Sequence, residues 1–278
     1  MCFEVNAVPP ELPPHLSAHL SSSSGASGGA GTSGGAGTSA GQHVTLTSAD
    51  GTELAAYVTR PAAPTGAGIV ILPDVRGLFH FYEELAQRFA TAGVEAIAID
   101  YFGRTAGMAP RPDDFDFMAH VAQVKLDQVM QDVAAAVAYL RSMPGARVSA
   151  IFTAGFCFGG FLSFMQGVQH HGLAGVIGFY GNPAGTQRFP SISPTAQAAQ
   201  FECPVLGLFG GADQGIPAES VQQFDQALAA AGIEHELITY PGAPHSFFDR
   251  TYQQYQAESA DAWQRMLSFI RAHTPPRA

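Results

Sequence analysis

The sequence predicts an α/β fold in which a mainly parallel central sheet carries helices on both faces. From Gln42 onward, short apolar runs alternate with longer amphipathic segments, and such strand–helix alternation is typical of parallel sheets. Some runs, such as GIVIL at 68–72, are apolar at every position, which indicates strands buried on both faces. Ligands bind such sheets at the carboxyl ends of the strands, so residues that follow each buried run are candidates for function.

The first expected element is a β-hairpin, because two runs, 43–47 and 53–59, flank the turn sequence Asp50-Gly51. Apolar runs and helical periodicity then predict the other elements in chain order: strand 68–72, helix 82–92, strand 94–99, helix 126–141, strand 148–153, a helix starting near Cys157, strands 175–179 and 204–209, helix 218–231, strand 235–239 and a helix around 253–272. Strands that are separated by helices in this way favour parallel pairing.

The first 41 residues differ in composition from the rest of the chain. Residues 1–20 are rich in Pro, and residues 21–41 contain only Ser, Gly, Ala and Thr, with GGAGTS twice in succession. Because such a segment has almost no side chains to bury, we expect a disordered N-terminal tail over 1–41. Residues 42–278 are expected to form a single domain.

Composition excludes several classes of protein. The net charge is −10 and Lys125 is the only lysine, so the chain has no basic stripe for nucleic acid. Cys2, Cys157 and Cys203 are too few and too scattered for a disulfide framework or a zinc site, and no metal or other cofactor is expected. The sequence has no secretory signal and no apolar run of the about 18 residues that a membrane span needs. We therefore expect a cytoplasmic monomer or homodimer that acts on a small molecule, without a membrane or nucleic-acid partner.

The segment AGFCFGG at 154–160 carries the first chemical signal. It fits the pattern G-x-nucleophile-x-G, in which a sharp turn from strand into helix lifts the central residue, here Cys157, above the sheet. Gly155 and Gly159 leave room for the turn. The helix N-terminus favours a thiolate, although it supplies only about 0.3–1 kcal/mol, so a partner is needed as well. The alternative is a small buried cysteine in a glycine-rich turn.

The partners follow in the right order. Asp213 lies on the loop after strand 204–209, in GGADQGIP, and His245 lies on the loop after the last strand, in YPGAPHSFF. Nucleophile, acid and base occur in this chain order in α/β-hydrolases. His245 would accept the thiol proton, and Asp213 would fix its tautomer and favour the imidazolium. Alone, Asp213 could be a helix N-cap and His245 a turn histidine.

The loop PDVRGLF after strand 68–72 is the expected oxyanion loop. In this fold it supplies one backbone N–H, for which Val75 is the candidate, and the residue after the nucleophile, Phe158, supplies the other. Asp74 is an acid close to the thiol, which could hold the proton of Cys157 or tune its ionisation. Its alternative role is to cap the turn.

With GFCFGG, GGADQGIP and PGAPHSFF in this order, the chain resembles the dienelactone hydrolase family, the carboxymethylenebutenolidases, over about 43–272. The likeness is specific, because a cysteine in this turn is unusual among α/β-hydrolases. It implies a compact single domain that opens a cyclic enol-ester lactone to an acyclic keto acid, without metal or cofactor.

The resemblance also implies roles for charged residues. Family members have a carboxylate, usually glutamate, that interacts with the resting cysteine, and Asp74 matches this position with one methylene less. The family uses arginines to hold the substrate carboxylate. Arg104, in DYFGRTAG, matches one of them, and Arg250, in HSFFDRTY, matches the other with an offset. Either arginine could instead lie on the surface, and Arg76 is a further candidate.

Together these features predict a hydrolase that opens a small ester or lactone carrying a carboxylate, through a thioester on Cys157. Water activated by His245 would then release the acid. Three alternatives remain open from the sequence. They are a broad esterase or thioesterase in which the arginines do not select acids, a non-catalytic α/β-hydrolase that acts as a binding module, and a redox protein using Cys157, for which no C-x-x-C exists.

Overall fold

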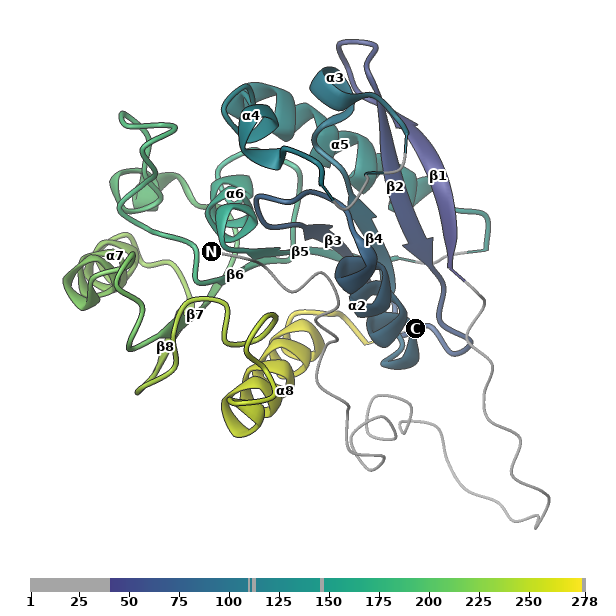
Figure 1. The fold of residues 1–278 in the computed structure, drawn as a ribbon. Helices are drawn as coiled ribbons and strands as arrows, with labels where there is room; N and C mark the ends of the chain where they lie inside the picture. Colours follow the sequence, from purple (N-terminus) through teal and green to yellow (C-terminus); the bar gives the residue numbers. More distant parts are fainter. Residues whose placement is uncertain (1–40, 110, 112–113, 146–147, 277–278) are drawn as a thin grey trace, which may run out of the picture.

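The computed structural model describes residues 41–109, 111, 114–145 and 148–276. Its centre is an eight-stranded sheet in the order β1-β2-β4-β3-β5-β6-β7-β8 (Figure 1). The strands are β1 (Gln42–Thr47), β2 (Glu53–Thr59), β3 (Ala67–Leu72), β4 (Glu95–Ile99), β5 (Ala150–Phe156), β6 (Gly175–Phe179), β7 (Val205–Gly210) and β8 (His235–Tyr240). The longer helices are α2 (His80–Thr91), α5 (Leu126–Ser142), α6 (Phe158–Gln166), α7 (Ala218–Ala230) and α8 (Gln256–Ala272).

The sheet is antiparallel only at the edge where the described chain begins. β1 pairs with β2 and β2 with β4 in antiparallel fashion, whereas every pair from β4 to β8 is parallel. The predicted hairpin is confirmed: Asp50 Oδ1 accepts a hydrogen bond from the amide of Thr52 at 3.0 Å, as turn-forming aspartates do. All the carboxyl ends of the parallel strands therefore meet along one edge of the sheet.

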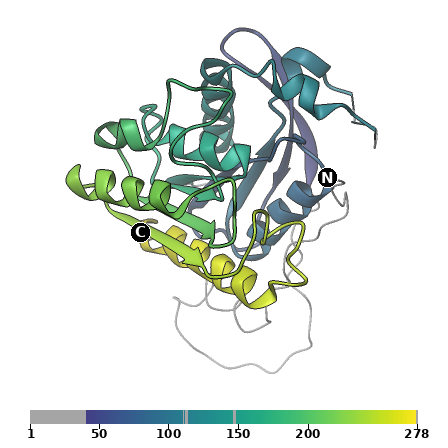
Figure 2. The same cartoon turned by 60° about the vertical axis from the view of Figure 1, so that its left-hand side comes forward.

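Helices cover both faces of the sheet, as the sequence predicts (Figures 1 and 2). Side chains alternate along β3, so that Ile69 and Ile71 join the core under α2 and α8, while Val70 and Leu72 join the core under α5 and α6. Between α2 and α8, the rings of Phe89 and Trp263 lie 4.9 Å apart. The mainly parallel sheet between two helical layers confirms the predicted α/β-hydrolase fold.

Short elements escaped the sequence analysis. These are α3 (Gly103–Ala106), α4 (Phe117–Val121) and the 3₁₀ helix η1 (Thr195–Gln200), each too short to show helical periodicity. β5 extends to Phe156, three residues beyond the expected strand 148–153, because the small Ala154 and Gly155 continue its pairing with β6. The cysteine therefore follows the strand directly.

The predicted N-terminal tail over 1–41 lies outside the described residues apart from Gly41. Its disorder and the domain boundary therefore stay predictions. Within the described ranges, no helix combines the length and apolar character that crossing a bilayer requires.

Candidate active site

Cys157 occupies the turn between β5 and α6 in a backbone conformation that few side chains adopt, with φ 57° and ψ −115°. The turn closes so tightly that a Cβ on Gly155 would overlap the carbonyl oxygen of Gly159, and a Cβ on Gly159 would overlap the carbonyl oxygens of Leu72 and Pro73. Only glycine fits at the two flanking positions. A strained residue of this kind persists where the surrounding structure over-determines it, as at functional sites.

Asp213 and His245 come from loops after β7 and β8 and meet beside this turn. His245 Nδ1 lies 2.6 Å from Asp213 Oδ2, within the range of a charge-assisted hydrogen bond. The other oxygen of Asp213 accepts a hydrogen bond from the amide of Gly215 at 2.8 Å, which fixes the carboxylate plane. Asp213 is almost fully buried and His245 is half-buried, so the carboxylate meets the imidazole in a medium that strengthens their attraction.

The thiol of Cys157 lies beside the imidazole of His245 and helps to set its pKa. Burial lowers the pKa of His245, but the hydrogen bond with Asp213 and the neighbouring Cys157 outweigh burial and raise this pKa to about 10. The ring is therefore cationic at neutral pH, next to the thiol. The structure thus brings together the three residues that the sequence singles out, and an imidazolium beside a thiol is the arrangement that favours a thiolate.

The two expected oxyanion donors lie on neighbouring segments, the start of α6 and the loop after β3. Phe158 is the first residue of α6, and Val75 lies on the loop after β3. The close approach of Gly159 to the backbone of Leu72 and Pro73 brings the first turn of α6 against this loop. The two amides therefore belong to adjoining backbone segments beside Cys157, and their oxyanion role stays a prediction.

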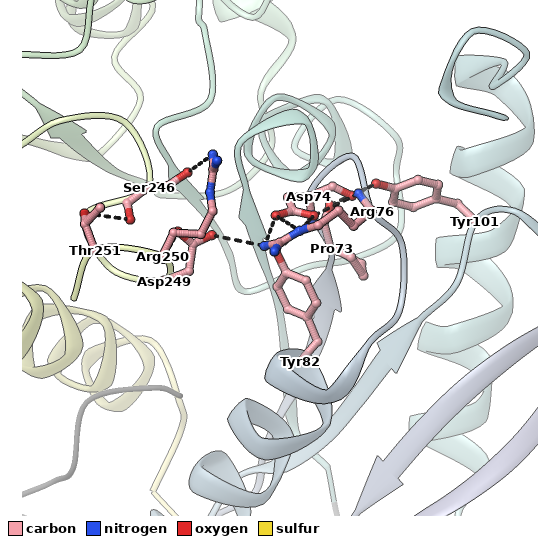
Figure 3. A network of polar contacts seen from close by, with 9 residues as sticks. All are labelled: Pro73, Asp74, Arg76, Tyr82, Tyr101, Ser246, Asp249, Arg250 and Thr251. Atoms are coloured by element: carbon pink, nitrogen blue, oxygen red, sulfur yellow. Dashed lines mark hydrogen bonds and ion pairs between the residues drawn. The ribbon is translucent and has the colours of Figure 1, made fainter. Parts of the chain in front are cut away.

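Asp74 is held by Arg76 in a buried ion pair (Figure 3). Its Oδ2 lies 2.5 Å from Arg76 Nη2 and 2.9 Å from Arg76 Nε. Its Oδ1 accepts a hydrogen bond from the backbone amide of Arg76 at 2.9 Å, which is the turn-capping role that the sequence left open. A second acid, Asp249, lies 4.0 Å from Arg76. Burial and the neighbouring Asp74 raise the pKa of Asp249 to about 6. The predicted tuning of Cys157 by Asp74 stays a prediction.

The structure separates the two predicted substrate arginines. Arg104, in α3, pairs with Asp50 of the β1–β2 turn at 2.8 Å and with the fully buried Asp132 of α5 at 2.7 Å. These ion pairs give Arg104 a structural role that the sequence analysis did not foresee, and its substrate role stays a prediction. Arg250 lies on the same loop as His245 and donates a hydrogen bond to Ser246 Oγ at 2.7 Å (Figure 3).

Sequence analysis missed two tyrosines at the site. Tyr180 is fully buried and its ring centroid lies 5.0 Å from that of His245. Tyr101 donates a hydrogen bond to the carbonyl oxygen of Asp74. Tyr180 directly follows the buried parallel strand β6, and Tyr101 lies two residues beyond the end of β4. The rule that located Cys157 at the carboxyl end of its strand would have located both tyrosines too.

Comparison with known proteins identifies the family of this chain. The family model described as "Dienelactone hydrolase family" matches residues 54–274. The chain belongs to the dienelactone hydrolase family. A protein of Salmonella typhimurium, provisionally named a carboxymethylenebutenolidase, is 32% identical over 236 residues, covering 82% of this chain and 86% of that protein.

Two further relatives extend the comparison. A Bradyrhizobium protein, provisionally named a 2-oxo-3-(5-oxofuran-2-ylidene)propanoate lactonase, is 27% identical and covers 81% of this chain and 91% of its own. The crystal structure of a Klebsiella pneumoniae protein, provisionally assigned as a dienelactone hydrolase, superposes with a TM-score of 0.72 at 27% identity, covering 83% of this chain and 98% of that chain. This dienelactone hydrolase family member is accordingly a carboxylic ester hydrolase whose substrates are small esters or lactones.

Proposed function

We propose that the enzyme opens a small anionic ester or lactone by transferring its acyl group to Cys157 and then to water. The observation that carries the proposal is the position of His245, whose ring is hydrogen-bonded to Asp213 and lies beside the thiol of Cys157. An imidazole oriented by a carboxylate and adjacent to a thiol on a sharp strand–helix turn is the arrangement of a nucleophile with its general base.

In the first half of the reaction, the Cys157 sulfur attacks the ester carbonyl as a thiolate, with its proton already held by His245. The carbonyl π electrons move to oxygen, where the amides of Val75 and Phe158 donate hydrogen bonds. When the tetrahedral adduct collapses, the bond to the leaving oxygen breaks and that oxygen takes a proton from His245. The product is a thioester, and in a lactone the leaving hydroxyl stays attached to the acyl group.

In the second half, His245 takes a proton from water, whose oxygen attacks the thioester carbonyl. The C–S bond breaks, the free acid is released and the sulfur returns to its resting state. A thiolate expels an enolate or phenolate readily, whereas an amine would need fuller protonation before it leaves. We therefore propose esters and lactones rather than peptides as substrates.

Trapping the acyl-enzyme tests this proposal. We expect acid quenching during turnover of a bulky ester, p-nitrophenyl trimethylacetate, to leave one acyl group on the peptide that contains Cys157, removable by hydroxylamine. Cys203 is the internal control, because burial raises the pKa of its thiol to about 12 and keeps it protonated. Mass spectrometry of the digested protein reads both peptides. A burst of nitrophenolate with the acyl group on any residue other than Cys157 would contradict the proposal.

For the substrate carboxylate we propose Arg250 as the anchor. It lies on the His245 loop with its guanidinium beside Ser246, the residue that follows the base. A charge-assisted hydrogen bond from arginine to a carboxylate contributes about 1.5–3 kcal/mol. Arg104 cannot offer the same anchor without giving up its ion pairs with Asp50 and the buried Asp132.

Arg250→Ala is therefore expected to lower the ratio of kcat/KM for a carboxylated p-nitrophenyl ester to that for its neutral analogue by about 10- to 100-fold, which is one such bond expressed as a rate ratio. Arg104→Ala is the matched control and should leave the ratio unchanged. The ratio does not depend on the fraction of folded enzyme, so any loss of stability in the control does not disturb the comparison. A ratio that fell only in Arg104→Ala would exchange the roles of the two arginines. An unchanged ratio in both variants would favour a broad esterase.

A further inference from the structure

The peptide bond between Asp74 and Val75 is anchored through its carbonyl oxygen. The hydroxyl of Tyr101 donates to the carbonyl oxygen of Asp74 (Figure 3). The amide of Gly77 donates to the same oxygen at 3.1 Å. In the preceding peptide, between Pro73 and Asp74, the amide of Asp74 donates to the hydroxyl of Tyr82 at 2.8 Å. The backbone on both sides of Asp74 is thus held by side-chain hydroxyls.

This anchoring fixes the direction of the Val75 amide. In a trans peptide the carbonyl and the N–H point in opposite directions, so holding the Asp74 oxygen at Tyr101 turns the Val75 N–H away from that tyrosine. Among the described residues, the Val75 amide donates to no carbonyl or side chain. The next peptide is held too, since the amide of Arg76 donates to Asp74 Oδ1 at 2.9 Å.

Tyr101 contacts the other half of the oxyanion hole as well. Its ring packs edge-on against Phe158, with centroids 6.0 Å apart and an interplanar angle of 77°. Only 4% of Tyr101 is exposed, so neither contact competes with solvent. Burial and the nearby carboxylates raise the pKa of Tyr101 well above its usual value, and the hydroxyl remains a donor over the whole working pH range.

We infer that Tyr101 is a positioning residue for oxyanion stabilisation: its hydroxyl orients the Val75 amide through the Asp74 carbonyl, and its ring supports the segment that carries the Phe158 amide. This inference rests on the proposed function, because it matters only for a reaction that creates charge on a carbonyl oxygen. Preorganised donors stabilise a developing charge because they need no reorientation during the reaction. Without the hydroxyl, the turn hydrogen bond from Gly77 alone would hold the peptide.

Three measurements on Tyr101→Phe separate this role from a general structural one. We expect kcat for a p-nitrophenyl ester to fall about 10-fold with little change in KM, a part of the 10²- to 10³-fold that a whole oxyanion donor contributes. An aldehyde that adds to the thiolate, forming a C–S bond and placing charge on its oxygen, should bind about 10-fold more weakly by the same reasoning. Alkylation of Cys157 by iodoacetamide displaces iodide and creates no oxyanion, so its rate should not change.

Tyr57→Phe is the matched control, because it removes another buried tyrosine hydroxyl, one that accepts a hydrogen bond from Gln87 at 2.7 Å. All three measurements should match the wild-type enzyme in this variant. The inference would be overturned if Tyr101→Phe kept full activity and full aldehyde affinity, or if alkylation slowed as much as hydrolysis did. If acyl trapping located the nucleophile elsewhere, the proposed function would fail, whereas acylation of Cys157 together with unchanged kinetics and aldehyde affinity in Tyr101→Phe would overturn this inference alone. A wild-type protein that neither hydrolysed esters nor bound aldehydes would overturn both the proposed function and the inference about Tyr101.

Discussion

Cys157→Ala is expected to lower kcat/KM for any ester substrate by about 10⁴-fold or more, because it removes the only group proposed to form the thioester. Binding and the oxyanion donors would remain and account for residual rate. The fold should persist: Cys157 is only partly buried, and alanine keeps the Cβ that the left-handed backbone already accommodates. Steady-state hydrolysis together with a thermal unfolding curve measures both quantities.

Cys203→Ala is the control for the loss of a thiol. This cysteine is buried near the start of β7, so the variant should lose some stability through the small cavity it leaves, while it retains activity per folded molecule. Full activity in Cys157→Ala would refute thiol catalysis. Inactivation of Cys203→Ala with intact folding would show that the second thiol takes part in the reaction.

Asp213→Asn is expected to lower kcat by about 10²- to 10⁴-fold while the site keeps its shape. The asparagine amide can donate to His245 Nδ1, which would leave the proton on the ring nitrogen that must accept the thiol proton. The variant also removes the hydrogen bond that does most to raise the pKa of His245, so this pKa should fall toward its ordinary value. Activity should then depend on pH over a different range, which a kcat/KM profile from pH 5 to about 10 records.

Asp225→Asn provides a matched control on another aspartate–histidine pair. His235 Nε2 lies 3.2 Å from Asp225 Oδ1 on the exposed side of α7, far from any residue of the proposed mechanism. Replacing Asp225 by Asn should leave kcat and the pH profile of activity unchanged. If both variants lost activity equally, the effect of Asp213→Asn could not be assigned to the tautomer of His245.

The sequence predicted the parallel sheet and the three central site residues because each depends on local patterns. Apolar runs mark strands buried on both faces, and the carboxyl ends of parallel strands must share one edge, so Cys157, Asp213 and His245 could be placed together without coordinates. Glycine at both 155 and 159 indicated a tight turn, and the structure contains one.

Other features depend on contacts between distant segments, which no local pattern reveals. The partners of Arg104 are 54 and 28 residues away, at Asp50 and Asp132, and the position of Arg104 near the family motif suggested a substrate role instead. Tyr101 reaches the Asp74 carbonyl across two strand ends. The strand order places β4 beside β3, although helix α2 separates them in the sequence. The contact between the Tyr101 hydroxyl and the loop after β3 could therefore be recognised only once this order was known.

Gly155 and Gly159 determine which substitutions the turn around Cys157 tolerates. Serine differs from cysteine only in its γ atom, so under the proposed mechanism Cys157→Ser changes the nucleophile without adding an atom to the turn. A single added methyl group at Gly155 or Gly159 instead collides with the main chain of the same turn or of the β3 loop. The geometry of the turn therefore restricts positions 155 and 159 more than it restricts the γ atom at position 157.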